Sequence, residues 1–285
     1  MFNLWLNPIM PTDLMPSSFL RIGRWLTGIV CLPLVAAFAS DGFPAPGESK
    51  LVHFGNALPH VTNPAAGVDY QFHLSQESFE IFMPKNFRND GTFGLFVFMS
   101  PGDRMSLPTD WVAVLERRRL LCVLPQNIGN NQPFSRRVGL TYVGLLQTVE
   151  HFQLNPKRIY TGGLSGGARC ALQLAFLHND AIAGNIGVCG ANFYEAVPRV
   201  KATNTDTNYG IWPIPPKCLA AAKARVKFVF ITGAKDFRYG NILDIYHGGF
   251  EQNGFQAKLV DVPGMGHELC GRDSLEAAFR FIESK

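Results

Sequence analysis

The chain has 285 residues, of which 47% are hydrophobic and 17% charged, and its formal net charge is +4. This composition is typical of a folded globular protein and excludes a disordered chain. The small positive excess lacks the basic character of a nucleic-acid-binding protein, so no nucleic-acid partner is expected.

The first 39 residues have the pattern of an export signal. Arg21 and Arg24 precede an apolar run over residues 25–38, and Ala-Phe-Ala at 37–39 is an A-x-A cleavage site. A membrane-spanning helix needs about 20 apolar residues, whereas this run is shorter and is interrupted by a glycine and a proline. We therefore expect a cleaved signal peptide over residues 1–39, a secreted or periplasmic protein, and no stable membrane insertion after cleavage.

The next part of the chain leads into a folded domain. Residues 40–67 are rich in glycine and proline without a clear hydrophobic period, which predicts an irregular lead-in to a domain over 68–285. Apolar, β-branched runs then alternate with amphipathic ones. In chain order they predict paired strands at 70–74 and 79–83, a strand at 93–99, a helix at 110–116, a strand at 120–124 and a helix at 135–152.

The alternation continues to the end of the sequence. It predicts a strand at 158–161, a helix at 167–177, strands at 184–188 and 227–232, a helix at 241–252, a strand at 257–262 and a final helix striped by Leu275, Phe279 and Ile282. Residues 190–217 interrupt it with a proline-rich segment, expected to be a cap-like insertion. Strands that alternate with helices predict βαβ units, and hence a doubly wound, mainly parallel sheet flanked by helices.

The most informative motif is Gly-Leu-Ser-Gly-Gly at 163–167, which fits G-x-S-x-G between a predicted strand and a predicted helix. Small residues around Ser165 allow the sharp turn that projects a nucleophilic hydroxyl. Taken alone, the motif also fits a glycine-rich turn with an incidental serine.

Two other reactive side chains follow predicted strands. Asp236 comes after the strand at 227–232, and His267 comes after the strand at 257–262. Active residues gather at the carboxyl ends of parallel strands, and the order Ser, Asp, His is that of hydrolases built on a nucleophile elbow. The other candidates for the base and the acid are less well placed, because they lie early in the chain, on helices or in mid-strand: His53, His60, His73, His151, His178, His247, Asp244 and Asp261.

At these three loops the chain resembles the α/β-hydrolase superfamily over nearly all of residues 68–285, and it looks like the branch of secreted carbohydrate esterases and polyhydroxybutyrate depolymerases. The resemblance implies a serine esterase in which Ser165 attacks an acyl carbonyl, His267 accepts the hydroxyl proton and Asp236 holds the imidazole. It implies an ester substrate and no cofactor.

The tetrahedral intermediate of such a reaction needs hydrogen-bond donors in an oxyanion hole. The N–H of Gly166, directly after the nucleophile, is the first candidate. The second is expected from the loop after the strand at 93–99, where many relatives have His-Gly; because Pro101 has no N–H, the choice falls on Gly102, with Asp103 as the fallback. The acyl or alcohol pocket is assigned to Asn192, Phe193 and Tyr194.

Five cysteines follow the predicted signal, and an exported protein meets an oxidising compartment. A bridge between Cys189 and Cys218 would staple the segment 190–217, although the odd count leaves at least one free thiol and the pairing stays open. No C-x-x-C pair or His/Cys cluster in the sequence indicates a metal.

Several functions remain compatible with the same three residues. A polyester depolymerase, a peptidase or an acyltransferase would keep the triad, and a noncatalytic binding protein could use the same scaffold. The sequence does not decide the ester substrate or the oligomeric state.

Overall fold

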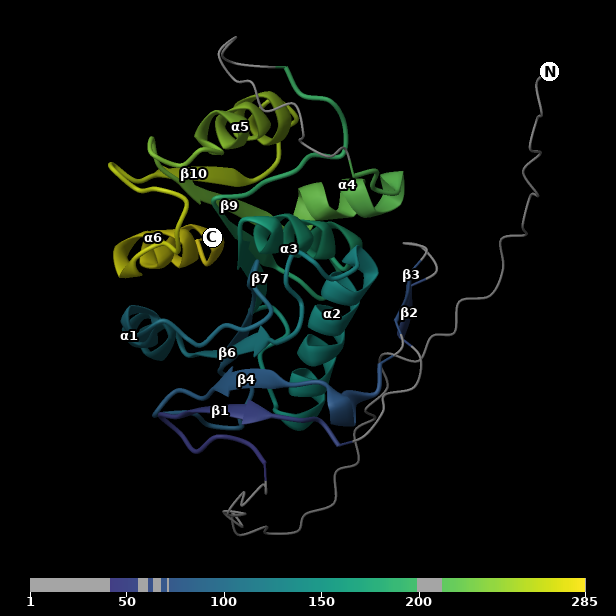
Figure 1. Cartoon of the computed structure of the whole chain (residues 1–285), viewed down its shortest axis with the longest axis vertical. Helices are drawn as coiled ribbons and strands as arrows, with labels where there is room; N and C mark the ends of the chain where they lie inside the picture. Colours follow the sequence, from purple (N-terminus) through teal and green to yellow (C-terminus); the bar gives the residue numbers. More distant parts are fainter. Residues whose placement is uncertain (1–41, 56–60, 64–67, 71, 199–211, 285) are drawn as a thin grey trace, which may run out of the picture. The chain divides into compact units, whose positions relative to one another are not determined.

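A central sheet of eight strands organises the computed structural model, which describes residues 42–55, 61–63, 68–70, 72–198 and 212–284 (Figure 1). The predicted signal peptide at 1–39 lies outside these residues. The strand order across the sheet is β1 (Ser49–Val52), β4 (Phe79–Phe82), β6 (Leu120–Pro125), β5 (Gly94–Met99), β7 (Ile159–Leu164), β8 (Gly184–Val188), β9 (Lys227–Thr232) and β10 (Ala257–Asp261). From β6 to β10 all neighbours are parallel, whereas β4 is antiparallel to both β1 and β6. The predicted doubly wound, mainly parallel sheet is therefore confirmed.

Helices cover both faces of the sheet (Figure 1). The helices α1 (Thr109–Arg118) and α6 (Arg272–Ile282) cover one face, and α2 (Phe134–His151), α3 (Gly166–Leu177) and α4 (Pro216–Arg225) cover the other. The short α5 (Tyr239–Asp244), continued by a π-helix over Ile245–Glu251, packs on the second face beside β9 and β10.

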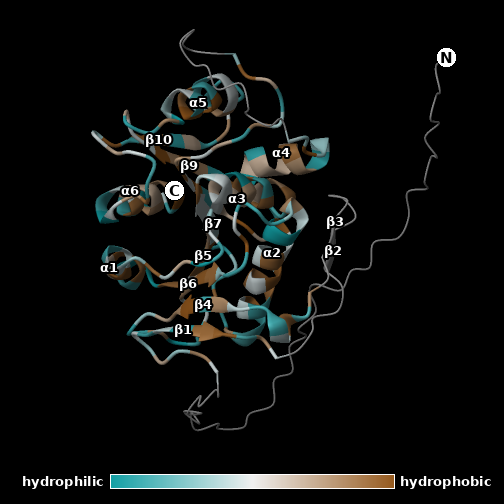
Figure 2. Ribbon diagram, viewed as in Figure 1, coloured by the Kyte–Doolittle hydropathy of each residue, from teal (hydrophilic) through white to brown (hydrophobic). Residues whose placement is uncertain are grey.

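The central strands are buried on both faces, and for this reason they appear in the sequence as continuous runs of apolar residues. In β5 every residue is buried, and its side chains alternate between the two cores. Leu95, Val97 and Met99 pack under α2 and α3, whereas Phe96 and Phe98 pack under α1 and α6. Figure 2 shows the same arrangement as hydrophobic strands enclosed by helices with mixed faces.

The lead-in predicted over residues 40–67 is not irregular throughout. Ser49–Val52 forms the edge strand β1, and Val61–Asn63 (β2) pairs with Val68–Tyr70 (β3) in a separate hairpin. Only Val52 of β1 is buried, because an edge strand lies over little core, so its sequence lacks the expected alternation.

The pairing predicted for strands at 70–74 and 79–83 is wrong. A 3-10 turn occupies Leu74–Gln76, and β4 pairs with β1 and β6 instead. The helix α4 was not predicted, although Pro216 at its first turn and the alanines that follow are helix signals. The other predicted strands and helices are present, with ends shifted by a few residues at most. Among the described residues, no helix has the length and hydrophobicity to cross a bilayer.

His178, at the end of α3, lies in the core and stacks on Tyr142 with ring centroids 3.6 Å apart. Burial lowers the pKa of His178 from 6.5 to about 4. On acidification the unfolded chain therefore binds a proton at this imidazole that the folded protein does not bind. The contribution of neutral His178 to the free energy of unfolding is complete above pH 6.5 and is lost as the pH falls toward 4.

We expect this imidazole to remove up to about 3 kcal/mol of unfolding free energy between those two pH values. Urea unfolding of His178→Phe, compared with the wild type at each pH, should show a shallower loss of stability on acidification. Parallel pH curves for the two proteins would contradict the prediction.

Candidate active site

Ser165 sits at the sharp turn where β7 ends and α3 begins, as the motif predicts. Its backbone has φ 56° and ψ −119°, a region that non-glycine residues rarely occupy and that marks functional strain. The Ser165 N–H donates to Val188 O at 2.8 Å, which fixes the turn on the neighbouring strand. A Cβ on Gly167 would overlap Met99 O and lie 2.7 Å from Met99 C, so only glycine lets α3 pack this closely on β5. The chain thus has the geometry of a nucleophile elbow.

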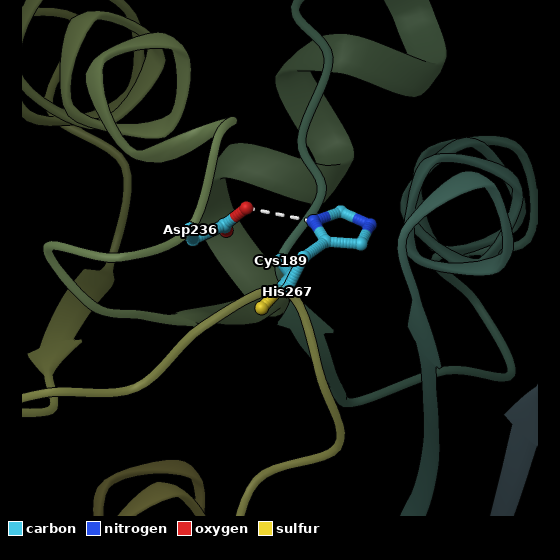
Figure 3. A group of neighbouring side chains, drawn as sticks. All are labelled: Cys189, Asp236 and His267. Atoms are coloured by element: carbon cyan, nitrogen blue, oxygen red, sulfur yellow. Dashed lines mark hydrogen bonds and ion pairs between the residues drawn. The ribbon is translucent and has the colours of Figure 1, made fainter.

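Asp236 and His267 form a hydrogen-bonded pair (Figure 3). The His267 Nδ1–H donates to Asp236 Oδ1 at 2.6 Å, and Asp236 also accepts from Thr232 Oγ1 at 2.8 Å and from Arg238 N–H at 2.9 Å. The carboxylate side chain is fully buried, whereas the imidazole is 20% exposed. Because an ionised carboxylate only accepts, Nδ1 carries the proton and Nε2 is left with the lone pair of a base. Figure 3 shows Nε2 on the side of the ring away from Asp236.

The loops that carry Ser165 and His267 meet at the end of β8. Gly190 lies against the Ser165 backbone, and the neighbouring Cys189 thiol donates to Gly266 O at 3.4 Å and to Glu268 O at 3.5 Å. The three residues predicted from separate loops are therefore brought to one edge of the sheet.

The contact between Gly190 and the Ser165 backbone predicts that even an alanine at position 190 lowers stability and activity. An alanine Cβ at this position would overlap Ser165 O and lie 2.9 Å from Ser165 C and 3.0 Å from its Cα, all of them backbone atoms. We expect Gly190→Ala to cost about 1 to 3 kcal/mol of stability and to lower activity by about 10² by displacing the elbow.

Thermal unfolding and esterase assays measure both effects. Gly271→Ala is the matched control, because its Cβ meets nothing closer than Asp110 Oδ2 at 4.0 Å. Equal behaviour of the two variants would show that the elbow tolerates the displacement.

The residues predicted to form the pocket are placed differently. Phe193 is 3% exposed and packs among core aromatics, with ring centroids 4.2 Å from Tyr194 and 5.1 Å from Phe250, so its predicted role in lining an open pocket is not supported. Asn192 is also buried, and neither polar atom of its side chain has a hydrogen-bond partner among the described residues. Tyr194 is half-buried against Phe193. The central part of the predicted cap, residues 199–211, lies outside the described residues.

The bridge predicted between Cys189 and Cys218 is wrong, because the five cysteines of the described residues are all free and buried. Cys189 contacts the loop that carries His267, whereas Cys218 is fixed within α4, where its carbonyl accepts from Asn179 Nδ2 at 3.2 Å. Burial raises the pKa of the Cys189 and Cys270 thiols to about 12 and that of Cys170 to about 11.

These thiols should therefore be inert in the folded protein. We expect the protein without its signal to show no rapid reaction with Ellman's reagent at pH 8 and five reactive thiols after denaturation without reductant. Fewer than five would indicate a disulfide.

Cys189, Asp236 and His267 are also a group that could hold a metal ion, since one ligand atom from each lies within 4.8 Å of the others. The donor set fits poorly. Metals bind the thiolate, which the raised pKa of Cys189 disfavours, and the Asp236 carboxylate already accepts three hydrogen bonds. We interpret the group as a hydrogen-bonded acid and base with a packing thiol beside them.

No protein-family model matches the chain, and comparison with curated proteins gives no match. Solved structures do match. A ferulic acid esterase superimposes with a TM-score of 0.53 at 15% identity over 84% of this chain and 98% of that chain. A fluorophosphonate-binding serine hydrolase of Staphylococcus aureus superimposes with a TM-score of 0.52 at 14% identity, over 84% of this chain and 100% of that chain. A feruloyl esterase module of Clostridium thermocellum, in complex with sinapinate, superimposes with a TM-score of 0.51 at 12% identity, over 84% of this chain and 87% of that chain. The chain has the α/β-hydrolase fold.

The α/β-hydrolase fold has defined positions for the oxyanion donors: the N–H after the nucleophile and an N–H from the loop after β5. Gly166, which directly follows Ser165 and starts α3, lies at the first of these positions. The Gly102 N–H donates to Ser100 Oγ at 3.0 Å, so in this conformation the predicted second donor is already engaged. The fallback, Asp103, turns toward the next loop, where its carbonyl accepts from Asn127 N–H at 2.6 Å and its carboxylate from Gly129 N–H at 2.9 Å.

Two exposed aromatic residues that the sequence does not single out lie on His267 and at the start of α2. Phe237 is 69% exposed, and its ring lies on His267 with centroids 4.1 Å apart and an interplanar angle of 33°. Phe134, at the start of α2, is also exposed and contacts Trp212 edge-on at 4.6 Å. The position of Phe237 directly after Asp236 in the sequence is the signal that could have placed its ring near His267. Exposed aromatic rings beside a site can contact apolar parts of a substrate.

Proposed function

We propose that this protein is a serine hydrolase that cleaves carboxylic esters. One observation carries the proposal: a serine in a strained elbow lies on the same edge of the sheet as His267, which is hydrogen-bonded to the buried Asp236, in the chain order of a hydrolase. The names of the structural neighbours, which include feruloyl esterases and a fluorophosphonate-binding serine hydrolase, support the same chemistry.

The proposed reaction has two balanced stages. Ser165 Oγ attacks the ester carbonyl carbon, its proton passes to His267 Nε2, and the carbonyl π pair moves to oxygen. The intermediate collapses when the bond to the alcohol oxygen breaks and that oxygen takes the proton from His267, which leaves an acyl-serine. Water then attacks the acyl carbon and gives its proton to His267, and the proton returns to Ser165 Oγ as the acid leaves. Asp236 holds the Nδ1 proton throughout and stabilises the imidazolium.

We propose that the substrates include esters with an apolar or aromatic group, such as acyl groups on polysaccharides. Phe237 is exposed beside His267, although large apolar side chains are usually buried. An ester panel that runs from acetyl xylan through feruloyl sugars to polyhydroxybutyrate tests this choice. Equal rates for small acetyl and bulky aromatic esters would contradict it.

We also propose export. The apolar run over residues 25–38 and the Ala-Phe-Ala site at 37–39 support cleavage before Ser40. Expression of the full chain in a bacterium, followed by N-terminal sequencing of the periplasmic and medium fractions, tests it. Recovery of uncleaved chain from the cytoplasm alone would overturn it.

The test of the enzymatic proposal uses the wild-type protein without residues 1–39. We expect hydrolysis of p-nitrophenyl acetate and butyrate, and covalent labelling by a fluorophosphonate that mass spectrometry maps to Ser165. Folded protein that neither hydrolyses esters nor takes the label would contradict the proposal. With excess alcohol present, a new ester formed ahead of free acid would identify a transferase instead.

A further inference from the structure

We propose that the side-chain amide of Asn130 is the second hydrogen-bond donor of the oxyanion hole, beside the N–H of Gly166. The inference rests on the proposed function, because it assigns a catalytic group to the same site. Nothing in the sequence pattern marks Asn130, which lies in the loop between β6 and α2.

The position of Asn130 is fixed from two sides. Its backbone N–H donates to Pro101 O at 2.8 Å, which ties it to the loop that normally supplies the second donor. Its side chain packs on the elbow: a Cβ placed on Gly166 would overlap Asn130 Oδ1 and lie 2.9 Å from Cγ and 3.2 Å from Nδ2. Glycine directly after the nucleophile thus leaves room for an amide that reaches the start of α3.

The amide is also available. It is exposed, and no hydrogen bond among the described residues engages the Asn130 side chain. The Gly102 N–H, by contrast, donates to Ser100 Oγ. An asparagine NH₂ offers two protons, and a 180° rotation about the terminal bond exchanges the positions of Oδ1 and Nδ2, so the donor can turn toward a developing negative charge.

The electrostatic setting favours this role. The partial positive charge at the N-terminus of α3 lies at Gly166, where an oxyanion would form. When Ser165 Oγ bonds to the acyl carbon, the carbonyl pair moves to oxygen, and the hydrogen bond from Nδ2 strengthens as that charge grows. A donor that acts in this way lowers the barrier more than it strengthens substrate binding.

The test compares Asn130→Ala and Asn130→Asp with Asn131→Ala, a neighbouring exposed asparagine outside the site. With p-nitrophenyl butyrate we expect Asn130→Ala to lower kcat by about 10² to 10³ with KM changed less than about threefold. Asn131→Ala should stay within about twofold of the wild type.

Asn130→Asp is nearly isosteric and adds a readout that a packing role would not move. At pH 8 its carboxylate would repel the oxyanion, so its rate should fall below that of Asn130→Ala. As the pH falls to 5, its rate relative to the wild type should rise, because a protonated carboxyl can donate. Circular dichroism and thermal unfolding check that each variant is folded.

The outcomes separate this inference from the proposed function. If the wild type neither hydrolyses esters nor takes the label, the function fails whatever Asn130 does. If the wild type is active and Asn130→Ala keeps its kcat, or loses efficiency only through KM, the oxyanion role is overturned while the function stands. If Asn130→Ala does not fold, folded Asn130→Asp decides: no change of its relative rate with pH overturns the role.

Discussion

Replacement of Ser165 by alanine is expected to lower kcat for ester hydrolysis by about 10⁶ and to abolish fluorophosphonate labelling. The hydroxyl oxygen is the atom that bonds to the acyl carbon, and no other group in the proposed mechanism replaces it. A small rate above that in water should remain, because the oxyanion donors still polarise a bound ester.

Stability should change little in this variant. Alanine retains the Cβ and the backbone N–H that donates to Val188 O, so the elbow keeps its anchor. Ser135→Ala, at an exposed position of α2, is the matched control for both assays. If Ser165→Ala and Ser135→Ala hydrolyse esters equally well, the motif is an ordinary glycine-rich turn.

Asp236→Asn should be the second most damaging change, with kcat lower by about 10⁴. Three donors converge on this carboxylate, from His267, Thr232 and Arg238, and an amide can offer only one oxygen to them. If its NH₂ group takes the position of Oδ1, it favours the wrong tautomer of His267 and faces the Arg238 N–H, which leaves a donor in the site unsatisfied. We therefore expect a loss of stability of about 1 to 3 kcal/mol as well.

Asp261→Asn provides the matched control. This aspartate ends β10, is exposed, and accepts from the Tyr239 hydroxyl at 2.6 Å. It is one of the two alternative acids that the sequence offers, with Asp244, and its amide variant should keep kcat within about twofold. Steady-state kinetics on both variants decides between them: a larger loss at Asp261 would mean that the acid has been misassigned.

The centre of this fold was predictable because its strands are buried on both faces. The strands β8 and β9 were predicted with their observed ends, and the elbow followed from glycines on both sides of Ser165. At the edge of the sheet the hydrophobic pattern is weak, because β1 buries only Val52. The sequence therefore predicts neither β1 nor which strands pair with β4.

The candidate site likewise has residues that the sequence identifies and contacts that it does not. Ser165, Asp236 and His267 were identifiable because each directly follows a strand. The engaged N–H of Gly102, the core position of Phe193 and the contact of Asn130 with Gly166 depend on side-chain packing between loops distant in sequence. Patterns along the chain do not report such contacts.

The edge strand β1 sets where this domain can be shortened. It covers the outer side of β4, and Phe54, just beyond it, is 2% exposed and packs on Phe79 at 4.9 Å. A shortened protein that starts at residue 68 would keep every proposed active-site residue, but it would leave the outer side of β4 unpaired and remove Phe54 from Phe79. Such an edge is a template for intermolecular strand pairing. Soluble material for crystallisation should therefore begin before Ser49, upstream of the boundary that the sequence indicates.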